Sequence, residues 1–476
     1  MQRFIHTTTK RNSSIANSTL KDTLKELIPK RRSELLQLRK DLANNHLPEN
    51  DITVGSILGG MRGLQLMYWQ SSTVDPNLGI KFHGYTIQEC QKLLPGPKNP
   101  NIFYPEAMFW LLLTGEIPNN KQVTGLTKQL NKIVTSMSTS KTSFLPEEVN
   151  KLMETLPSTM HPMTQFSIGV GSLSHFSKFR DNYSRGTINK LTMWEDTFDD
   201  VMMLLAFIPS LAGKVYSRIK GKGTNNDMLG EFDPKADWAK NLTSMLGLLN
   251  NRSSKNDEDI TDLMRLYTGI HADHEGGNVS AHTTHLVGSA LSDPMLSYSA
   301  GLLGLAGPLH GLAAQDVVKF LLETQNQVED STNEKQLEDY LWTILNNHRV
   351  IPGYGHAVLR CEDPRFTALV QFTKERQCQF KDDPNVNLML LLSKVAHRVL
   401  TKYGKCKNPF PNVDNASGIL FHHYGLTQLD FVTVLLGCSR AMGPLSQLVW
   451  DRIYGLPIER PKSVDFNYLK KFSTLS

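Results

Sequence analysis

The sequence contains few cysteines and no long hydrophobic run. Its five cysteines are odd in number and no two form a CxxC pair, which argues against a disulfide framework and a cysteine zinc site and favours a reducing compartment. The longest apolar run, VMMLLAFIPSLAG, is too short to cross a bilayer, and we expect Pro209 to break it. Membrane insertion is therefore not expected.

The sequence also lacks a strong excess of charge of either sign. Its 51 Lys and Arg and 46 Asp and Glu give a formal net charge of +5, and the basic residues are dispersed along the chain. Binding to nucleic acid needs a basic stripe, so no nucleic-acid partner is expected, whereas a mild positive bias suits small anionic substrates. The P-loop motif GxxxxGK(S/T) and a GxGxxG after a strand are both absent, which argues against a nucleotide-binding site.

The N-terminus is poor in acidic residues. The stretch MQRFIHTTTKRNSSIANSTLK carries four basic residues, many Ser and Thr, and no acidic residue before Asp22. This composition is typical of a mitochondrial transit peptide, and a disordered basic tail is the alternative. We predict a transit peptide over roughly residues 1–17 and a mature protein in the mitochondrial matrix.

Helical periodicity is what the sequence does contain. Apolar residues recur at spacings of three and four, and 40% of the 476 residues are hydrophobic, which is enough for a large core and two domains. No strands alternate with the helical segments, so we predict a mainly α fold, with short strands near 52–58 and 78–84 and surface loops at 250–260 and 325–337. The clearest helical segments are LKDTLKELIPKRRSELLQLRKDL, EAMFWLLLTG, MWEDTFDDVMMLLAF, DITDLMRLYTGI, LAAQDVVKFLLE, LEDYLWTILNN and NLMLLLSKVAHRVL.

Four stretches could carry chemistry, and the first is HADHEGGNVSAHTTH, residues 271–285. A metal site is one interpretation, because histidines at i and i+3 can share a face. The motif HExxH is absent, however, and Gly276 and Gly277 interrupt any helix between the two histidine pairs. We therefore expect most of these histidines to be packed and hydrogen-bonded, and one to contact a substrate.

The second stretch is GLAGPLHGLAAQ, residues 304–315, in which His310 precedes a helical segment. The helix dipole favours the neutral form of a histidine at a helix N-terminus. A neutral imidazole can donate a hydrogen bond to a carbonyl that is becoming an enolate. On spacing alone, a capping or core histidine is the competing interpretation.

The third stretch is IPGYGHAVLRCEDPRF. Gly353 and Gly355 predict a tight turn whose backbone a flat ring could approach closely. His356 and Arg360 are four residues apart and share a face if the residues between them are helical. We expect the proline before Arg365 to break the chain, so that this arginine points elsewhere. Arginines suit phosphates and carboxylates, and a surface ion pair is the alternative for each.

The fourth stretch is NPFPNVDNASG, residues 408–418. Two prolines hold the chain extended up to Asp414, and a helical pattern follows. A carboxylate that is held rigidly can act as a general base. An N-cap aspartate is the alternative interpretation.

These stretches belong to a longer series of motifs. The series runs in this order: TLKELIP, TVGSILGGMRGLQLMYWQ, PEAMFWLLLTG, MRLYTGIHADHEGG, GLAGPLHGLAAQ, VIPGYGHAVLR, DPRF, NPFPNVDNASGILFHHYG and CSRAMGPLSQLVWDRIYGLPIERPKS. With this series the sequence closely resembles eukaryotic mitochondrial citrate synthases, from about residue 20 to about residue 465. Among them it most resembles the fungal isoforms that accept propionyl-CoA as well as acetyl-CoA.

The resemblance implies the citrate synthase fold, which is mainly α, and a homodimer. In this family a subunit has a large helical domain and a smaller, mobile helical domain. The corresponding ranges here are 18–311 and 419–476 for the large domain and 312–418 for the small one. The implied reaction condenses oxaloacetate with acetyl-CoA, or with propionyl-CoA, to give citrate or 2-methylcitrate and CoA. No metal or other cofactor is implied, because the CoA thioester is itself a substrate.

The resemblance also implies roles for particular residues. Asp414 removes a proton from the α-carbon of the acyl-CoA, His310 hydrogen-bonds the thioester oxygen, and His356 polarises the ketone of oxaloacetate. The implied oxaloacetate-binding residues are His274, Arg365, Arg440 and, from the other subunit, Arg460. The implied CoA-binding residues are Arg62, Lys190, Val350, Gly353, Gly355 and Arg360.

The sequence departs from the better-known members at two places. Lys190 stands where animal enzymes place an arginine that reaches a CoA phosphate from the partner subunit. A lysine keeps the charge but loses the fork-shaped geometry. The stretch around 250–256 reads as a small polar insertion at the surface.

Three alternatives stay open. A strict citrate synthase would reject propionyl-CoA. A metal-dependent hydrolase built on the histidine cluster would bind zinc and lose its activity with a chelator. A non-catalytic helical scaffold would be expected to lack one or more of His310, His356 and Asp414, and all three are present.

Overall fold

The computed structural model describes residues 18–47, 52–138, 143–221, 230–249, 255–311 and 313–473. Within these ranges helices dominate, and the strands form one small sheet. The predicted mainly α fold is therefore confirmed. The transit peptide predicted at 1–17 lies outside the described residues, as does most of the polar insertion near residue 250.

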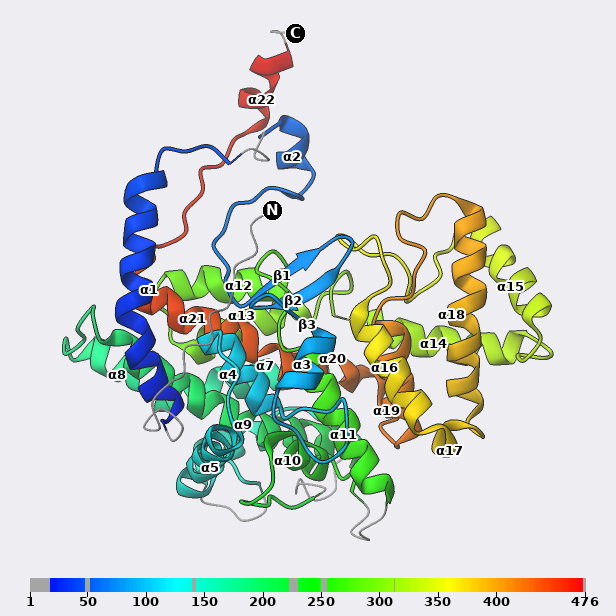
Figure 1. Ribbon diagram of the computed structural model, residues 1–476, viewed down its shortest axis with the longest axis horizontal. Coiled ribbons are helices and arrows are strands. Elements are labelled where there is room, and N and C mark those ends of the chain that lie inside the picture. The colour runs from blue at the N-terminus through cyan, green and yellow to red at the C-terminus, as the bar shows by residue number, and fades with distance from the viewer. Residues whose placement is uncertain are drawn as a thin grey trace.

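The helices gather in two groups (Figure 1). The smaller group, on the right of Figure 1, consists of α14 (Ala313–Gln327), α15 (Glu334–Asn346), α16 (Pro364–Glu375), α17 (Gln377–Phe380), α18 (Pro384–Tyr403) and α19 (Asp414–His423). The other helices are α1 (Leu20–Leu42), α2 (Val54–Leu58), α3 (Ile87–Leu93), α4 (Pro105–Thr114), α5 (Asn120–Met137), α6 (Glu147–Thr155), α7 (Pro162–Ser172), α8 (Lys178–Ser184), α9 (Met193–Lys220), α10 (Trp238–Met245), α11 (Lys255–Ile270), α12 (Val279–Ser289), α13 (Pro294–Leu305), α20 (Val432–Arg440), α21 (Met442–Tyr454) and α22 (Phe466–Ser473).

Helix α9 crosses the larger group and is buried along most of its length. It packs on α5, α7, α10 and α21. Pro209 lies inside this helix, so the expectation that it breaks the apolar run is wrong. An interior proline costs about 3 kcal/mol. Full burial of one large apolar side chain contributes about 1.5–3 kcal/mol, so packing on several sides of α9 offsets the cost.

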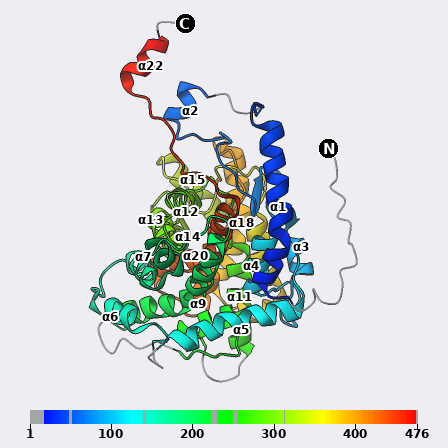
Figure 2. The same ribbon diagram turned by 90° about the vertical axis from the view of Figure 1, so that its left-hand side faces the viewer.

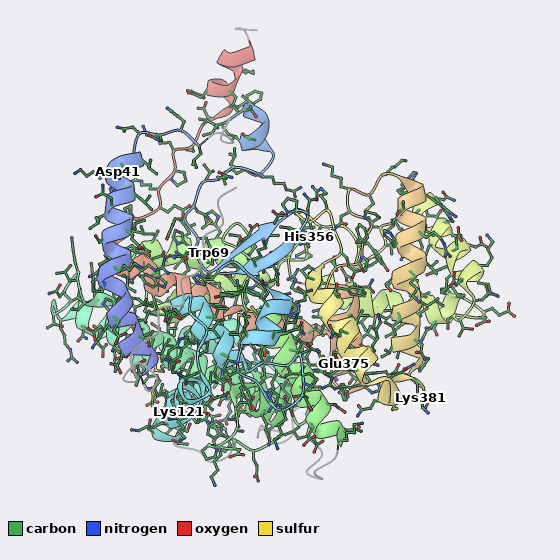
Figure 3. All side chains as sticks on the ribbon, viewed as in Figure 1. Asp41, Trp69, Lys121, His356, Glu375 and Lys381 are labelled. Carbon is green, nitrogen blue, oxygen red and sulfur yellow. The ribbon has the colours of Figure 1, made fainter. Side chains whose placement is uncertain are left out.

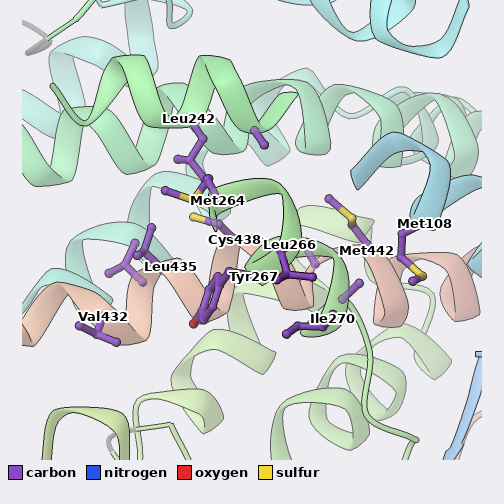
Figure 4. Close-up of a cluster of buried hydrophobic side chains, with 14 of the residues drawn as sticks. Met108, Leu242, Met264, Leu266, Tyr267, Ile270, Val432, Leu435, Cys438 and Met442 are labelled. Atoms are coloured by element: carbon purple, nitrogen blue, oxygen red, sulfur yellow. The ribbon is translucent and has the colours of Figure 1, made fainter. Parts of the chain in front are cut away.

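A buried cluster joins α11 to α20 and its neighbours, as Figure 4 shows. Packing in this cluster fixes the C-terminal end of α11, which His271 follows, against the helix that ends at Arg440. The core therefore brings together two segments that carry predicted site residues. The labelled members of the cluster are Met108, Leu242, Met264, Leu266, Tyr267, Ile270, Val432, Leu435, Cys438 and Met442.

The sheet is antiparallel, in the order β1 (Ser72–Asp75), β2 (Gly79–Phe82) and β3 (Tyr85–Thr86). The strand predicted near 78–84 is thus confirmed. The strand predicted near 52–58 is wrong, because this segment contains helix α2. Thr53 caps that helix and exchanges hydrogen bonds with Ser56 in a capping box, a local interaction that outweighs the β-branched residues.

Two loop predictions need correction. Of the loop expected at 250–260, residues 255–260 belong to helix α11, and residues 250–254 lie outside the described residues. The loop expected at 325–337 is confined to the residues between α14 and α15, that is 328–333. Polar side chains on the exposed faces of these helix ends account for both errors, because composition does not distinguish a polar helix end from a loop.

Helices α2 and α22 lie together beyond one end of the helical body in both views (Figures 1 and 2). The segments that carry them expose several large apolar side chains, namely Ile52, Leu58, Leu66, Ile458, Phe466 and Tyr468. Neither helix is covered by the body of the chain. In the described part of the chain, no helix is long and apolar enough to cross a membrane.

Candidate active site

Arg365 is buried in the first turn of α16. Asp363 is the N-cap of this helix, and Pro364 occupies its first turn, where a proline is well tolerated. The Asp363 carboxylate accepts hydrogen bonds from Nε of Arg365 at 3.0 Å and from Nη2 at 2.7 Å. This two-pronged contact fixes the orientation of the guanidinium. Pro364 therefore starts a helix rather than breaking the chain.

Arg440 ends α20 and is 3% exposed. Its Nε donates a hydrogen bond to the backbone carbonyl of His271 at 3.1 Å. The charges of Arg365 and Arg440 both act on the pKa of His274 and on the pKa of Asp414. The expectation that Arg365 points away from the other candidates is therefore wrong, and the two arginines define the centre of the site.

His274 lies in the loop between α11 and α12. Its ring centroid is 5.5 Å from that of His356. Burial, and then the charges of Arg365 and Arg440, hold the pKa of His274 well below its ordinary value, so the ring is neutral. Among the buried side-chain atoms of the described residues, its Nε2 is one that has no hydrogen-bond partner. Such an atom is a natural contact for a ligand.

The other three histidines of the 271–285 stretch have protein partners. His271 Nδ1 contacts the Tyr267 carbonyl at 2.9 Å, and His282 and His285 each contact a carboxylate at 2.8 Å. The prediction that most of these histidines are hydrogen-bonded is confirmed. In the described residues, no group of three or more His, Cys, Asp or Glu is placed to hold a metal ion.

His310 sits in the turn between α13 and α14. Its Nε2 accepts a hydrogen bond from the Ser280 backbone N–H at 3.3 Å and lies 3.1 Å from Ser280 Oγ. Since a backbone N–H can only donate, Nε2 is unprotonated and the ring proton is on Nδ1. Burial, and then the charge of Arg440, lower the pKa of His310 to about 4. His310 is therefore a neutral donor through Nδ1.

His356 has the opposite tautomer. Its Nδ1 accepts hydrogen bonds from the backbone N–H groups of Val358 at 3.0 Å and Leu359 at 2.9 Å, so its proton is on Nε2. Burial, and then the charge of Arg365, lower the pKa of His356 to about 4. This ring too is neutral and offers one N–H.

The segment from His356 to Arg360 is not helical, so the condition under which the two residues would share a helix face is not met. The His356 ring accepts hydrogen bonds from the backbone N–H groups of Val358 and Leu359, which folds the segment into a loop. Arg360 lies over the same loop, and its Nη1 donates to the carbonyl oxygens of Val358 at 3.0 Å and Leu359 at 2.7 Å. The loop is thus held by its own side chains.

The predicted glycine turn is present. Gly353 has φ +81° and Gly355 has φ +84°, both in the left-handed region that favours glycine. The Gly353 carbonyl accepts a hydrogen bond from the Asn412 backbone N–H at 2.9 Å, and the Gly355 N–H donates to the Asn408 carbonyl at 3.1 Å. The turn is therefore tied to the segment that leads to Asp414.

Asp414 is the first residue of α19. The N-cap is Val413, which makes no side-chain capping bond, so the alternative that Asp414 is the cap is wrong. Burial raises the pKa of Asp414 to about 6, although the charges of Arg365 and Arg440 oppose the shift. At neutral pH the group is an ionised carboxylate, and it is a stronger base than an exposed aspartate.

Several predicted site residues are exposed, unlike the residues of this centre. Arg62, Lys190 and Arg460 are exposed, on a turn after α2, a turn before α9 and the segment after α21, respectively. Val350 is 82% exposed. In one subunit these four side chains therefore face solvent, whereas the two arginines are buried.

Two residues of the site were not singled out from the sequence. Ser280 fixes the tautomer of His310, and Asp363 orients Arg365. The Asp-Pro pair at 363–364 carried a signal, because aspartate before proline is typical of an N-cap followed by the first helical turn. No local sequence pattern indicated Ser280, since its partner His310 is 30 residues away.

The site lies where the two groups of helices meet. Figure 3 shows His356 beside the β1–β2 hairpin, between the larger group and the smaller one. The backbone N–H of Arg360 donates to the Pro76 carbonyl, in the turn of that hairpin, at 2.6 Å. Residues from both groups thus face a single centre.

Two groups of helices meet at a centre that holds neutral histidines, buried arginines and a carboxylate of raised pKa. Such a centre is suited to acid–base chemistry on anionic substrates. The fold is similar to that of solved citrate synthases. The Pyrobaculum aerophilum enzyme superimposes with a TM-score of 0.70 at 21% identity, covering 88% of this chain and 95% of that one. A ternary complex of the Thermoplasma acidophilum enzyme with carboxymethyl coenzyme A and oxaloacetate gives 0.67 at 19% identity, covering 87% and 96%.

Comparison of sequences identifies the family. Residues 60–462 match the family described as "Citrate synthase, C-terminal domain". Mitochondrial citrate synthase 3 of Saccharomyces cerevisiae is 51% identical over 96% of this chain and 93% of its own. The mitochondrial 2-methylcitrate synthase of Fusarium solani is 48% identical over 97% and 93%. The chain belongs to the citrate synthase family.

Proposed function

We propose that this enzyme condenses oxaloacetate and water with acetyl-CoA to give citrate and CoA, and with propionyl-CoA to give 2-methylcitrate. The observation that carries the proposal is the pairing of two neutral histidines of opposite tautomer with a buried carboxylate of raised pKa. A base and two N–H donors are the groups that enolisation and addition to a ketone require.

The first step forms the enol or enolate. The Asp414 carboxylate takes a proton from the α-carbon of the acyl-CoA while His310 donates its Nδ1–H to the thioester oxygen. A thioester α-proton is a very weak acid, so stabilisation of the developing oxyanion has to supply much of the barrier reduction. A positioned base adds about 10²- to 10⁴-fold.

The second step forms the carbon–carbon bond. The nucleophilic α-carbon attacks the ketone carbon of oxaloacetate, and the Nε2–H of His356 donates a hydrogen bond to the ketone oxygen as that oxygen becomes an alkoxide. Oxaloacetate is a dianion, which suits Arg365, Arg440 and the free Nε2 of His274. Arg460 of the partner subunit completes this binding set in the proposal.

The last step hydrolyses the thioester of the condensation product to release CoA. It has to wait until the carbon–carbon bond is formed, so water must be controlled. We place the movement that does this between a large domain, 18–311 and 419–476, and a small domain, 312–418. The loop from Gly353 to Arg360 belongs to the smaller group and contacts the β1–β2 hairpin through the Arg360 N–H, which is where closure would align the reacting atoms.

The CoA-binding residues in the proposal are the glycine turn and basic groups near it. Gly353 and Gly355 let the adenine approach the backbone beside Val350, and Arg62, Arg360 and Lys190 supply charge for the phosphates. Arg62 and Lys190 are exposed in a single subunit, in keeping with contacts that a dimer would bring together. No cofactor takes part in the proposed chemistry.

A homodimer in the mitochondrial matrix is part of the proposal. The exposed apolar segments around α2 and α22 offer a surface that a second copy would cover. The relatives reported above are named as mitochondrial enzymes, and the names cover both citrate and 2-methylcitrate synthases. They therefore support both acyl-CoA substrates.

The test is thiol release by the purified protein without its first 17 or so residues. Oxaloacetate is offered with acetyl-CoA and then with propionyl-CoA, and kcat/KM is compared. Values within about tenfold, or about 1.4 kcal/mol in transition-state binding, support dual use. Reaction with acetyl-CoA alone would identify a strict citrate synthase, since one methylene is worth about 1–3 kcal/mol in a pocket. His310→Ala should fold normally and lose turnover by orders of magnitude.

A further inference from the structure

A network of two histidines and two carboxylates lies outside the catalytic centre. His282 Nε2 donates to Glu459 Oε1 at 2.8 Å, and His285 Nδ1 donates to Asp451 Oδ2 at the same distance. The second ring nitrogen of His285 is 3.6 Å from the other Glu459 oxygen. The network therefore joins α12, α21 and the segment after α21.

The backbone of the same segment is also attached to α12. The Glu459 N–H donates to Ser289 Oγ at 3.0 Å, and Ser289 is buried. Glu459 thus makes one backbone and two side-chain contacts with a single helix, although the rest of the segment is largely exposed. Glu459 is therefore the point at which this segment is attached to α12.

The residue after Glu459 is Arg460. Pro461 follows it and favours an extended conformation for Arg460. Neighbouring side chains of an extended chain point in opposite directions. Because Glu459 faces α12, Arg460 faces away from its own subunit, and it is exposed.

We propose that Glu459, held by His282, His285 and Ser289, is a positioning residue that aims Arg460 at the oxaloacetate site of the partner subunit. This inference rests on the proposed function, in which Arg460 crosses the dimer interface. The long, flexible arginine side chain reaches its target with less loss of conformational freedom when its backbone is already fixed.

We call the network of His282, His285, Asp451 and Glu459 the clamp, and the charges around it favour ionic contacts. Burial alone would lower the pKa of His285, but the hydrogen bond to Asp451 and the charges of Asp451 and Glu459 raise it, against the nearby Arg452. The pKa of His285 is therefore raised above its ordinary value, and its two ring nitrogens face two carboxylates. The clamp and the catalytic centre share α12, because Ser280 in the first turn of that helix bonds His310.

The first experiment compares KM values in the full dimeric enzyme. Glu459→Gln and His282→Gln should each raise KM for oxaloacetate about tenfold, with KM for acetyl-CoA and the melting temperature unchanged. Glu334→Gln is the matched control, since Glu334 pairs with Arg398 on the surface of the smaller helical group and should change neither KM. An unchanged oxaloacetate KM in both clamp variants overturns the proposal.

Arg460→Ala separates this inference from the function on which it rests. It should raise KM for oxaloacetate more than Glu459→Gln does, and the double variant should match Arg460→Ala alone, because the clamp acts only through the arginine. If the double variant is additively worse, Glu459 acts by another route and the proposal fails. If wild-type protein does not condense the substrates at all, the proposed function has failed first.

Mixed dimers test the crossing directly. One subunit carries Asp414→Ala, so the only working site belongs to the other subunit and uses the Arg460 of the Asp414→Ala chain. Glu459→Gln placed on the Asp414→Ala chain should raise KM for oxaloacetate, and on the other chain it should leave KM unchanged. The reverse pattern, or an equal effect from both placements, overturns the proposal.

Discussion

The raised pKa of Asp414 makes a prediction about stability as well as catalysis. The folded protein binds a proton at this carboxylate more tightly than the unfolded chain does, since the pKa rises from 3.8 to about 6. The wild-type protein therefore loses stability as the pH rises through this interval. Asp414→Asn, which keeps the shape and removes the charge, should be more stable than wild type at neutral pH and almost inactive.

The magnitude follows from linkage. One pKa unit corresponds to 1.36 kcal/mol, so the ionised carboxylate costs about 3 kcal/mol at pH 7 and about 1.6 kcal/mol at pH 5, where it is mostly protonated in the folded state. An unfolding entropy of about 2.1 cal/mol/K per residue over 476 residues gives about 1 kcal/mol/K per subunit. Asp414→Asn should thus melt about 3 °C above wild type at pH 7 and about half as far above it at pH 5.

The assay is thermal unfolding of both proteins at pH 5 and pH 7, at one fixed subunit concentration because the melting temperature of the proposed dimer depends on concentration. Asp363→Asn is the matched control. Burial would raise the pKa of Asp363, but Arg365 lowers it below its ordinary value. The control should therefore lose stability at pH 7 where Asp414→Asn gains it.

Two results would refute this reasoning. Asp414→Asn could be less stable than wild type at pH 7, which would mean that the carboxylate is stabilised by its surroundings and is a weak base. The difference in melting temperature could also be the same at both pH values, which would mean that Asp414 does not titrate between them. Either result removes the physical basis for Asp414 as the general base.

Three further predictions concern pH, the glycine turn and metals. The acid limb of the pH profile of kcat/KM should have an apparent pKa of about 6, from Asp414. His310 and His356 have pKa values of about 4, so they should add no limb above pH 5. An acid limb with an apparent pKa near 7 would contradict this assignment. Gly353→Ala should raise KM for acetyl-CoA and should melt at a lower temperature than Gly404→Ala. Both glycines have positive φ, which costs an L-residue about 1–2 kcal/mol, but only at Gly353 does a side chain lie 3.0 Å from the added Cβ. Equal effects of the two substitutions would remove the role of the turn. Dialysis against a chelator should leave turnover unchanged, and loss restored by zinc would revive the hydrolase alternative.

The sequence determined most of the helices and the candidates for the site. Amphipathic periodicity is local, so segments such as those of α14, α15 and α18 could be read directly. His310, His356 and Asp414 each lie in a glycine- or proline-rich motif whose chemistry is visible without a partner. The family resemblance added their roles, and these remain predictions.

Tertiary structure alone decided the contacts between distant segments. Pro209 fits inside α9 because packing on several sides outweighs a local cost. His310 meets Ser280 across 30 residues, and Glu459 meets His282 across 177 residues. The protonation states of the site also depend on burial and on two arginines from different helices. Such contacts are set by how the core packs, and no local pattern in the chain encodes them.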